Sequence, residues 1–210
     1  MSKYTLIESL YIYPTPAGVY YALSSPDKNE IKSFLINLLQ QSTTPELNVS
    51  NLLMLSNSDD ENKAFDLLYE CQKLGWVQGL KEAIKTPSGR LEDILPSLLS
   101  KLSTKGKVLL ADYQGFFLAS HGFTADIAEE FSALAAEISR LRVRSARLLM
   151  NDMGLESHAW SSATATGKSQ LGFWPLFIGE HQFIISILGV PYFNQPEFVS
   201  LAWTLTHRYS

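Results

Sequence analysis

Apolar residues recur every three or four positions through much of the first half of this chain, a spacing that predicts amphipathic helices. The first apolar stripe runs from Ile31 to Leu39. Asp27 and Glu30 lie just before it with the spacing of a capping box, so we expect a helix to start there. The helices predicted by this pattern cover residues 27–39, 49–55 and 61–74. We expect a short strand to follow them at 76–80.

Two runs rich in tyrosine and aliphatic side chains predict a β-hairpin near the amino-terminal end. The runs are residues 10–13 and 19–23, with Pro14 to Gly18 between them. Proline restricts φ and glycine tolerates positive φ, which makes both common in turns. Further along, residues 81–90 are polar and contain Pro87 and Gly89, a composition typical of a domain boundary. We therefore expect two domains, 1–85 and 90–210.

Residues 90–210 alternate between helical and strand periods, which predicts an α+β domain with a mixed-order central sheet between helices. The expected order is a helix at 91–102, strands at 108–111 and 116–119, a long helix after Thr124, strands at 155–166, 173–178 and 182–190, and a helix after Asn194. Pro96 requires the first helix either to begin near it or to bend there, because proline removes a helical hydrogen bond.

The long helix carries both large and small apolar residues. The large ones have helical spacing, so we expect them to face the core; they are Ile127, Phe131, Leu134, Ile138 and Leu141. Its alanines leave a low surface that would let another helix approach closely. The dimer contacts expected on this surface are Ala128, Ala135 and Ala136.

The thin strand at 155–166 is the second surface expected to form a dimer. Its residues are mostly small, and an uncovered edge strand tends to pair with another chain. Trp160 is the expected anchor, because aromatic side chains dominate the energy of buried contacts. The contacts expected along this strand are Ser157, Trp160, Ser162 and Thr164.

The balance of charge argues against nucleic acid as a partner. The chain has a net charge of -4, and residues 1–85 hold ten acidic residues against seven lysines and no arginine. Affinity for phosphate backbones comes from clustered Lys and Arg. Arg140, Arg144 and Arg147 share one helical face, which either meets an acidic partner surface or is a solvated helix end balanced by the helix dipole.

The residue pattern predicts no catalytic, metal or cofactor site. The four histidines are scattered singly, and Cys71 is the only cysteine, so neither a disulfide nor a cysteine zinc site is available. Ser120 and His121 are adjacent on a strand, where neighbouring side chains point to opposite faces. Residues 167–169 imitate the end of a phosphate loop, but its first glycine is missing. We expect a protein that is not an enzyme.

No apolar run approaches the roughly 20 residues that span a bilayer. Glu8 and several tyrosines interrupt the first residues, which disfavours a signal peptide. These features favour a cytoplasmic protein without membrane insertion.

The order of elements in residues 90–210 resembles the roadblock family, the dynein light-chain type of domain also found in bacterial and archaeal regulators of small GTPases. The most specific part is VLLADYQGFFLASHG, with its turn glycine at Gly115, followed by DIAEEFSALAAEI. This resemblance implies a homodimer in which the middle strands pair edge to edge and the long helices lie side by side. Residues 1–85 resemble a winged helix.

Three functions remain open from the sequence. The roadblock resemblance implies a non-enzymatic dimeric regulator or scaffold that binds a small Ras-like GTPase or a related assembly partner, with or without an effect on GTP hydrolysis. The alternative is a transcription regulator with a DNA-binding winged helix and a C-terminal dimerisation domain. In a third interpretation, the C-terminal sheet forms a ligand-sensing pocket.

Overall fold

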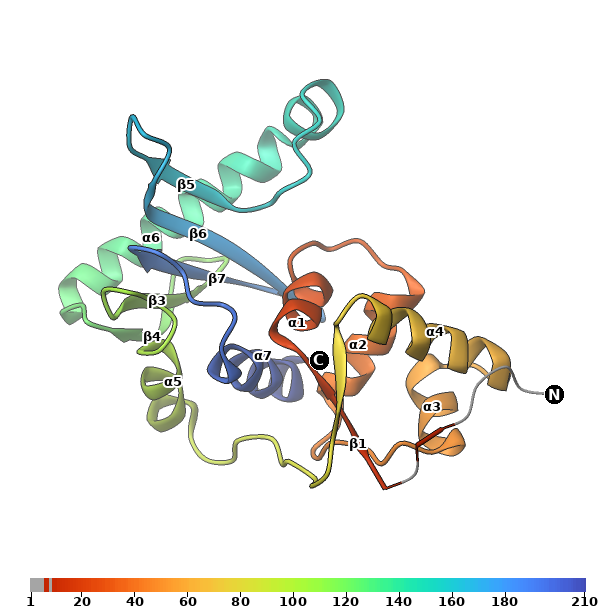
Figure 1. Cartoon of the computed structure of the whole chain (residues 1–210). Coiled ribbons are helices and arrows are strands. Elements are labelled where there is room, and N and C mark those ends of the chain that lie inside the picture. Colours follow the sequence, from red (N-terminus) through yellow and green to blue (C-terminus); the bar gives the residue numbers. More distant parts are fainter. Residues whose placement is uncertain (1–5, 8) are drawn as a thin grey trace.

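The computed structural model describes residues 6, 7 and 9–210 and shows two sheets with helices packed around them (Figure 1). The argument against a signal peptide rests partly on Glu8, which lies outside the described residues. The elements of the N-terminal half are β1 (Tyr11–Pro14), α1 (Pro16–Leu23), α2 (Glu30–Gln40), α3 (Val49–Ser56), α4 (Glu61–Lys73) and β2 (Val77–Leu80). Those of the C-terminal half are α5 (Leu91–Leu99), β3 (Lys107–Asp112), β4 (Phe117–His121), α6 (Ala125–Arg144), the π-helix η1 (Arg147–Asp152), β5 (Trp160–Ala163), β6 (Ser169–Ile178), β7 (His181–Leu188) and α7 (Pro196–Tyr209).

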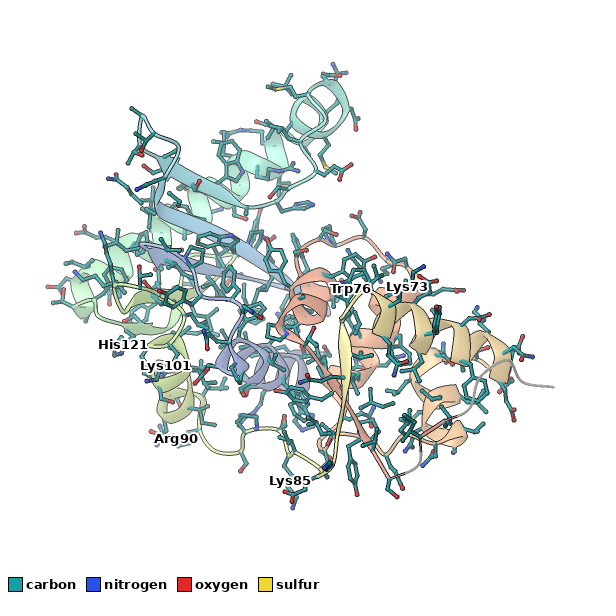
Figure 2. The ribbon with its side chains drawn as sticks, viewed as in Figure 1. Lys73, Trp76, Lys85, Arg90, Lys101 and His121 are labelled. Atoms are coloured by element: carbon teal, nitrogen blue, oxygen red, sulfur yellow. The ribbon has the colours of Figure 1, made fainter. Side chains whose placement is uncertain are left out.

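The hairpin expected at the start is wrong, because its second strand is the helix α1. The hydroxyl of Thr15 caps this helix by accepting a 3.2 Å hydrogen bond from the backbone N–H of Gly18. Gly18 is not a turn residue: a Cβ added there would lie 2.2 Å from the carbonyl oxygen of Trp76. Glycine therefore lets α1 approach β2 closely. Figure 2 shows Trp76 where the chain leaves α4 after Lys73 and enters β2.

The three further helices predicted for the N-terminal half are present as α2, α3 and α4, with a shifted start for α2. Asn29 caps α2 by accepting a 2.8 Å hydrogen bond from the N–H of Lys32, whereas Asp27 accepts one from the hydroxyl of Ser25 at 2.9 Å. Strand β2 pairs antiparallel with β1. The likeness of this half to a winged helix stays a prediction.

The five-stranded sheet of the C-terminal half is antiparallel with the strand order β4-β3-β7-β6-β5. Its helices and strands follow one another in the order expected from the sequence, apart from η1, and the α+β class is correct. One face packs on α6, where Leu109 and Ala111 contact Ala128. The other face, with Val108 and Leu110, joins the core that includes α5 and α7.

Two elements of this half differ in length from their predictions. Helix α5 begins at Leu91, so Pro96 lies inside it rather than at its start. Strand β5 comprises only Trp160–Ala163, and its pairing with β6 has a register irregularity between Ser162 and Ala163. The thin strand is thus shorter than the expected 155–166, but it does form one edge of the sheet.

The main hydrophobic core runs through both halves of the described chain, apart from two small clusters under α6. Phe34 of α2 and Phe198 of α7 belong to it and have no exposed surface. The polar segment between Lys85 and Arg90 passes outside this core along the lower edge of Figure 2. The halves therefore pack against each other, and the division into two separately folding domains stays a prediction.

Candidate functional site: the outer face of α6 and the edge of β5

Helix α6 directs its alanines, rather than its large apolar residues, toward the sheet. Ala128, Ala135 and Ala136 have no exposed surface. Of the five residues expected to face the core, three are exposed: Ile127 at 51%, Leu134 at 47% and Leu141 at 39%. The expected core stripe is therefore wrong for these three residues. The three alanines expected at a dimer contact lie instead between α6 and the rest of their own chain, where a second helix does not reach them.

Side-chain size explains this orientation of α6. Alanine lets the helix lie close to the sheet, where Ala135 contacts Phe173 of β6 and Ile184 of β7. Phe131 fills the margin of the contact, with its ring centroid 5.7 Å from that of Phe173. Gly115 supports the same approach, because Ser132 donates a 2.6 Å hydrogen bond to its carbonyl oxygen. Close packing of this kind maximises dispersion contacts across the interface.

Three of the exposed residues of α6 are large and apolar and lie along one stripe of the helix. Ile127, Leu134 and Leu141 are spaced by seven residues, nearly two helical turns, and so lie on one face. Ile138 is half-buried, and it lines a small cavity together with Trp160 of β5. The apolar surface therefore extends from the stripe toward the edge of the sheet.

Strand β5 has an unpaired edge in the part of the chain that the structure describes. It pairs with β6 alone, with Trp160 opposite Phe173. Ser162 is exposed on this strand. Ser157 precedes the strand and accepts a 3.1 Å hydrogen bond from the N–H of Ala159, while the hydroxyl of Thr164 accepts one from Lys168 in the following turn. Of the four expected contacts, only Trp160 and Ser162 belong to β5.

A buried arginine next to this edge was not singled out from the sequence. Arg142 is 5% exposed and forms no ion pair with any described carboxylate. Its Nε and Nη2 lie 3.4 and 3.5 Å from the carbonyl oxygens of Ser157 and Leu155. A cavity of about 180 Å³ lies between Arg142 and Trp160. The sequence feature that points to the burial of Arg142 is its seven-residue spacing from Ala135, which puts both on the same helical face as Ala128.

The three arginines expected to share a partner-binding face have different environments. Arg140 is half-buried: it forms a 2.7 Å ion pair with Glu137 and a 3.2 Å hydrogen bond to the carbonyl oxygen of Gln114. Arg144 and Arg147 are exposed and form no ion pair with any described residue. Because α6 ends at Arg144 and η1 begins at Arg147, regular helical spacing does not join all three.

His158 lies two residues before the start of β5 and lines the small cavity that Ile138 and Trp160 also border. Its ring meets that of Phe177 edge-on, with centroids 5.4 Å apart. Burial lowers the pKa of His158 below its ordinary value, and the positive charge of Arg142 lowers it further. The imidazole is therefore held in its neutral form more strongly than in the unfolded chain.

No further chemical site emerges from the side chains that the structure describes. They include no group of three or more His, Cys, Asp or Glu that could hold a metal ion. Among the described helices, none has both the length and the apolar character needed to cross a membrane. The absence of enzymatic activity and of a cofactor stays an expectation from the sequence.

Comparisons with known proteins give limited information. No protein-family model and no curated protein matches this chain. Among solved structures, the chain is similar to a Roadblock/LC7 domain from Streptomyces avermitilis, with 12% sequence identity and a TM-score of 0.33. The alignment covers 56% of this chain and 89% of that one. This likeness is too weak to decide fold or function, which are therefore inferred from this chain's own elements and surfaces.

Proposed function

We propose that residues 90–210 form a roadblock-type module through which two copies of this chain associate, and that the dimer acts as a non-enzymatic cytoplasmic regulator or scaffold. The observation that carries this proposal is the exposed stripe of Ile127, Leu134 and Leu141 beside the unpaired edge of β5. The element order in residues 90–210, which is the order expected of that family, supports it.

Physical chemistry favours covering both surfaces. Fully burying a leucine or isoleucine side chain contributes about 1.5–3 kcal/mol, so three half-exposed side chains provide a substantial driving force for association. The free N–H and C=O groups of an edge strand can pair with a second strand. Trp160 lies at this edge and provides an aromatic anchor.

The partner that we propose for this dimer is a small Ras-like GTPase or a related assembly protein. Two exposed arginines, Arg144 at the end of α6 and Arg147 at the start of η1, provide positive charge for an acidic surface on that partner. Binding of this kind could order the catalytic loops of the GTPase without any catalytic group from this chain. The N-terminal half would provide a second docking face.

The oligomeric state of the whole chain tests the dimer. Sedimentation velocity over a range of micromolar concentrations should show a dimer for the wild type and a monomer for Leu134→Glu. The circular dichroism spectrum of Leu134→Glu should match that of the wild type, which would show that the variant is folded. Leu74→Glu is the matched control, because Leu74 is also 47% exposed but ends α4 in the other half. A wild type that stays monomeric, or a Leu134→Glu variant that stays dimeric, would contradict the proposal.

Turnover of GTP tests the proposed partner. Ras-like GTPases from the same genome would be assayed with and without this protein, and binding would be measured in parallel. Binding that the double variant Arg144→Glu, Arg147→Glu weakens supports the proposal, and a change in turnover would separate an activator from a scaffold. Absence of binding to every such GTPase would overturn this part of the proposal.

The outer face of α4 gives little support to the alternative, a transcription regulator. In a winged helix this position would hold the recognition helix, yet its exposed side carries Glu61, Asp66 and Glu70. Lys63 on that helix is already paired with Glu30 at 2.5 Å. DNA binding that falls steeply with salt would revive this alternative.

A further inference from the structure

A cavity of about 400 Å³ lies between the two halves of the chain, next to the segment that leads into β5. Its walls come from α1, from the loop between α1 and α2, from α2 and from the residues just before β5. The lining side chains that matter most are Tyr20, Tyr21, Ser25, Lys32, Ser157 and His158. A second cavity, of about 520 Å³, shares Ser25, Asp27 and Lys32 with the first, so Lys32 borders both.

Lys32 is a buried cation that forms no direct ion pair with a described residue and reaches the Asp27 carboxylate only through the hydroxyl of Ser25. Only 4% of its surface is exposed. Its Nζ donates to the hydroxyl of Ser25 and lies 3.5 Å from the carbonyl oxygen of the same residue. Burial lowers the pKa of Lys32, and the charge of Asp27 opposes this shift. A buried ammonium group is strongly stabilised when an anion accepts its remaining proton.

The hydroxyl of Tyr21 provides a second donor in the same cavity. It accepts a 2.9 Å hydrogen bond from the side-chain amide of Asn29, and no described residue accepts its own proton. The Tyr21 ring is held in place by stacking on Trp76, with centroids 3.9 Å apart. Lys32 Nζ lies 5.4 Å from the centroid of the same ring. The ammonium of Lys32 and the ring that carries the Tyr21 hydroxyl are thus held in place in one cavity.

The remaining charges around the cavity limit the kind of ligand. His158 opposite Lys32 adds an imidazole that forms no hydrogen bond with the rest of the described chain. Asp27 and Glu156 also line the cavity, and the Asp27 carboxylate already accepts a hydrogen bond from Ser25. These two carboxylates would repel a polyanion, whereas a small anion of low charge fits beside Lys32.

We infer that this cavity is a binding site for a small oxyanion, a carboxylate or a phosphate, which accepts hydrogen bonds from the ammonium of Lys32 and the hydroxyl of Tyr21. The rings of Tyr20 and Tyr21 would pack against any apolar part of the ligand. The two proposed donors, Lys32 of α2 and Tyr21 of α1, lie outside the α6 stripe, whereas Ser157 and His158 border both sites.

Anion titrations of the full chain test this site. Sodium acetate and sodium phosphate would be titrated separately at constant ionic strength, with binding followed by calorimetry and thermal unfolding. Saturable binding of either anion supports the site. The titration in which binding is seen, with acetate or with phosphate, shows whether the site takes a carboxylate or a phosphate. Lys32→Met should weaken that binding about 10-fold or more, because a charge-assisted hydrogen bond is lost.

Two further variants keep the result interpretable. Lys101→Met removes an exposed lysine of the C-terminal half, labelled in Figure 2, and should bind the anion like the wild type. Tyr21→Phe keeps the stacked ring but removes the hydroxyl, and so should weaken binding even if Lys32→Met fails to fold. The inference is overturned if neither anion binds saturably, or if Lys32→Met and Tyr21→Phe bind as tightly as Lys101→Met.

Discussion

The indole Nε1 of Trp203 donates a 2.7 Å hydrogen bond to the carbonyl oxygen of Gln41, although 162 residues separate the two in sequence. Trp203 is 2% exposed and belongs to α7, whereas Gln41 directly follows α2 as its C-cap. The bond therefore joins the two halves inside their shared core. Tyr13 of β1 reinforces the contact, with its ring edge-on to Trp203 at a centroid distance of 6.1 Å.

Replacing Trp203 with Phe should lower the free energy of unfolding by about 1–3 kcal/mol, because the carbonyl of Gln41 loses its partner in a buried site. Urea unfolding followed by circular dichroism would measure this loss. We expect one cooperative transition for both proteins, since the halves share a core. Two separate transitions in the wild type would show instead that the halves unfold independently.

Replacing Gly18 with Ala should destabilise the protein by roughly 1–3 kcal/mol or more, because the added methyl would overlap the backbone of Trp76. The measurement is the midpoint of thermal or urea unfolding. Ala17→Ser is the matched control, since Ala17 is an exposed neighbour on α1 and should have little effect. A harmless Gly18→Ala would mean that α1 does not approach β2 as closely as described.

Cys71 should not react with thiol reagents in the native protein. It is fully buried on α4, and burial, aided by the charge of Glu70, raises its pKa to about 12. The thiolate is the reactive form, so labelling at about pH 8 should require unfolding. Ellman's reagent should detect no fast-reacting thiol in native buffer and one equivalent in concentrated urea. Rapid labelling in native buffer would indicate local opening of α4.

Stability should fall as the pH drops below about 6.5, in part because of His158. Its pKa is lower in the folded protein than in the unfolded chain, so the unfolded state binds more protons in this range and is favoured by acid. His158→Gln should reduce this loss between about pH 7 and pH 5. His121→Gln, which changes an exposed side chain of β4 labelled in Figure 2, should leave the loss of stability in this pH range unchanged. Equal slopes for both variants and the wild type would contradict the role of His158.

Much of the fold could be predicted from local pattern. The two hairpins of the large sheet, the long helix and the last helix follow from alternation, turn glycines and helical spacing, which depend on residues close in sequence. Residues 16–23 were misassigned because Pro16 and Gly18 are equally compatible with a turn and with a helix start. Contact with Trp76, distant in sequence, explains why glycine is needed there.

The candidate sites were less predictable, since each depends on contacts between distant elements. Arg142 and Lys32 look like ordinary basic residues of amphipathic helices, and the only local sign of burial is the seven-residue spacing of Arg142 from Ala135. Only packing places Arg142 beside the backbone of Leu155 and Ser157, and Lys32 between two cavities.

By itself, the sequence determined where most helices and strands lie and in what order, because backbone preference and hydrophobic period act over a few residues. Tertiary structure alone decided which side of α6 is buried. Both the alanine set and the larger set beginning at Ile127 have helical spacing, and either would make an amphipathic helix. Only the alanines are small enough to let α6 lie close to the sheet, so they are buried, and Ile127, Leu134 and Leu141 are exposed on the other side.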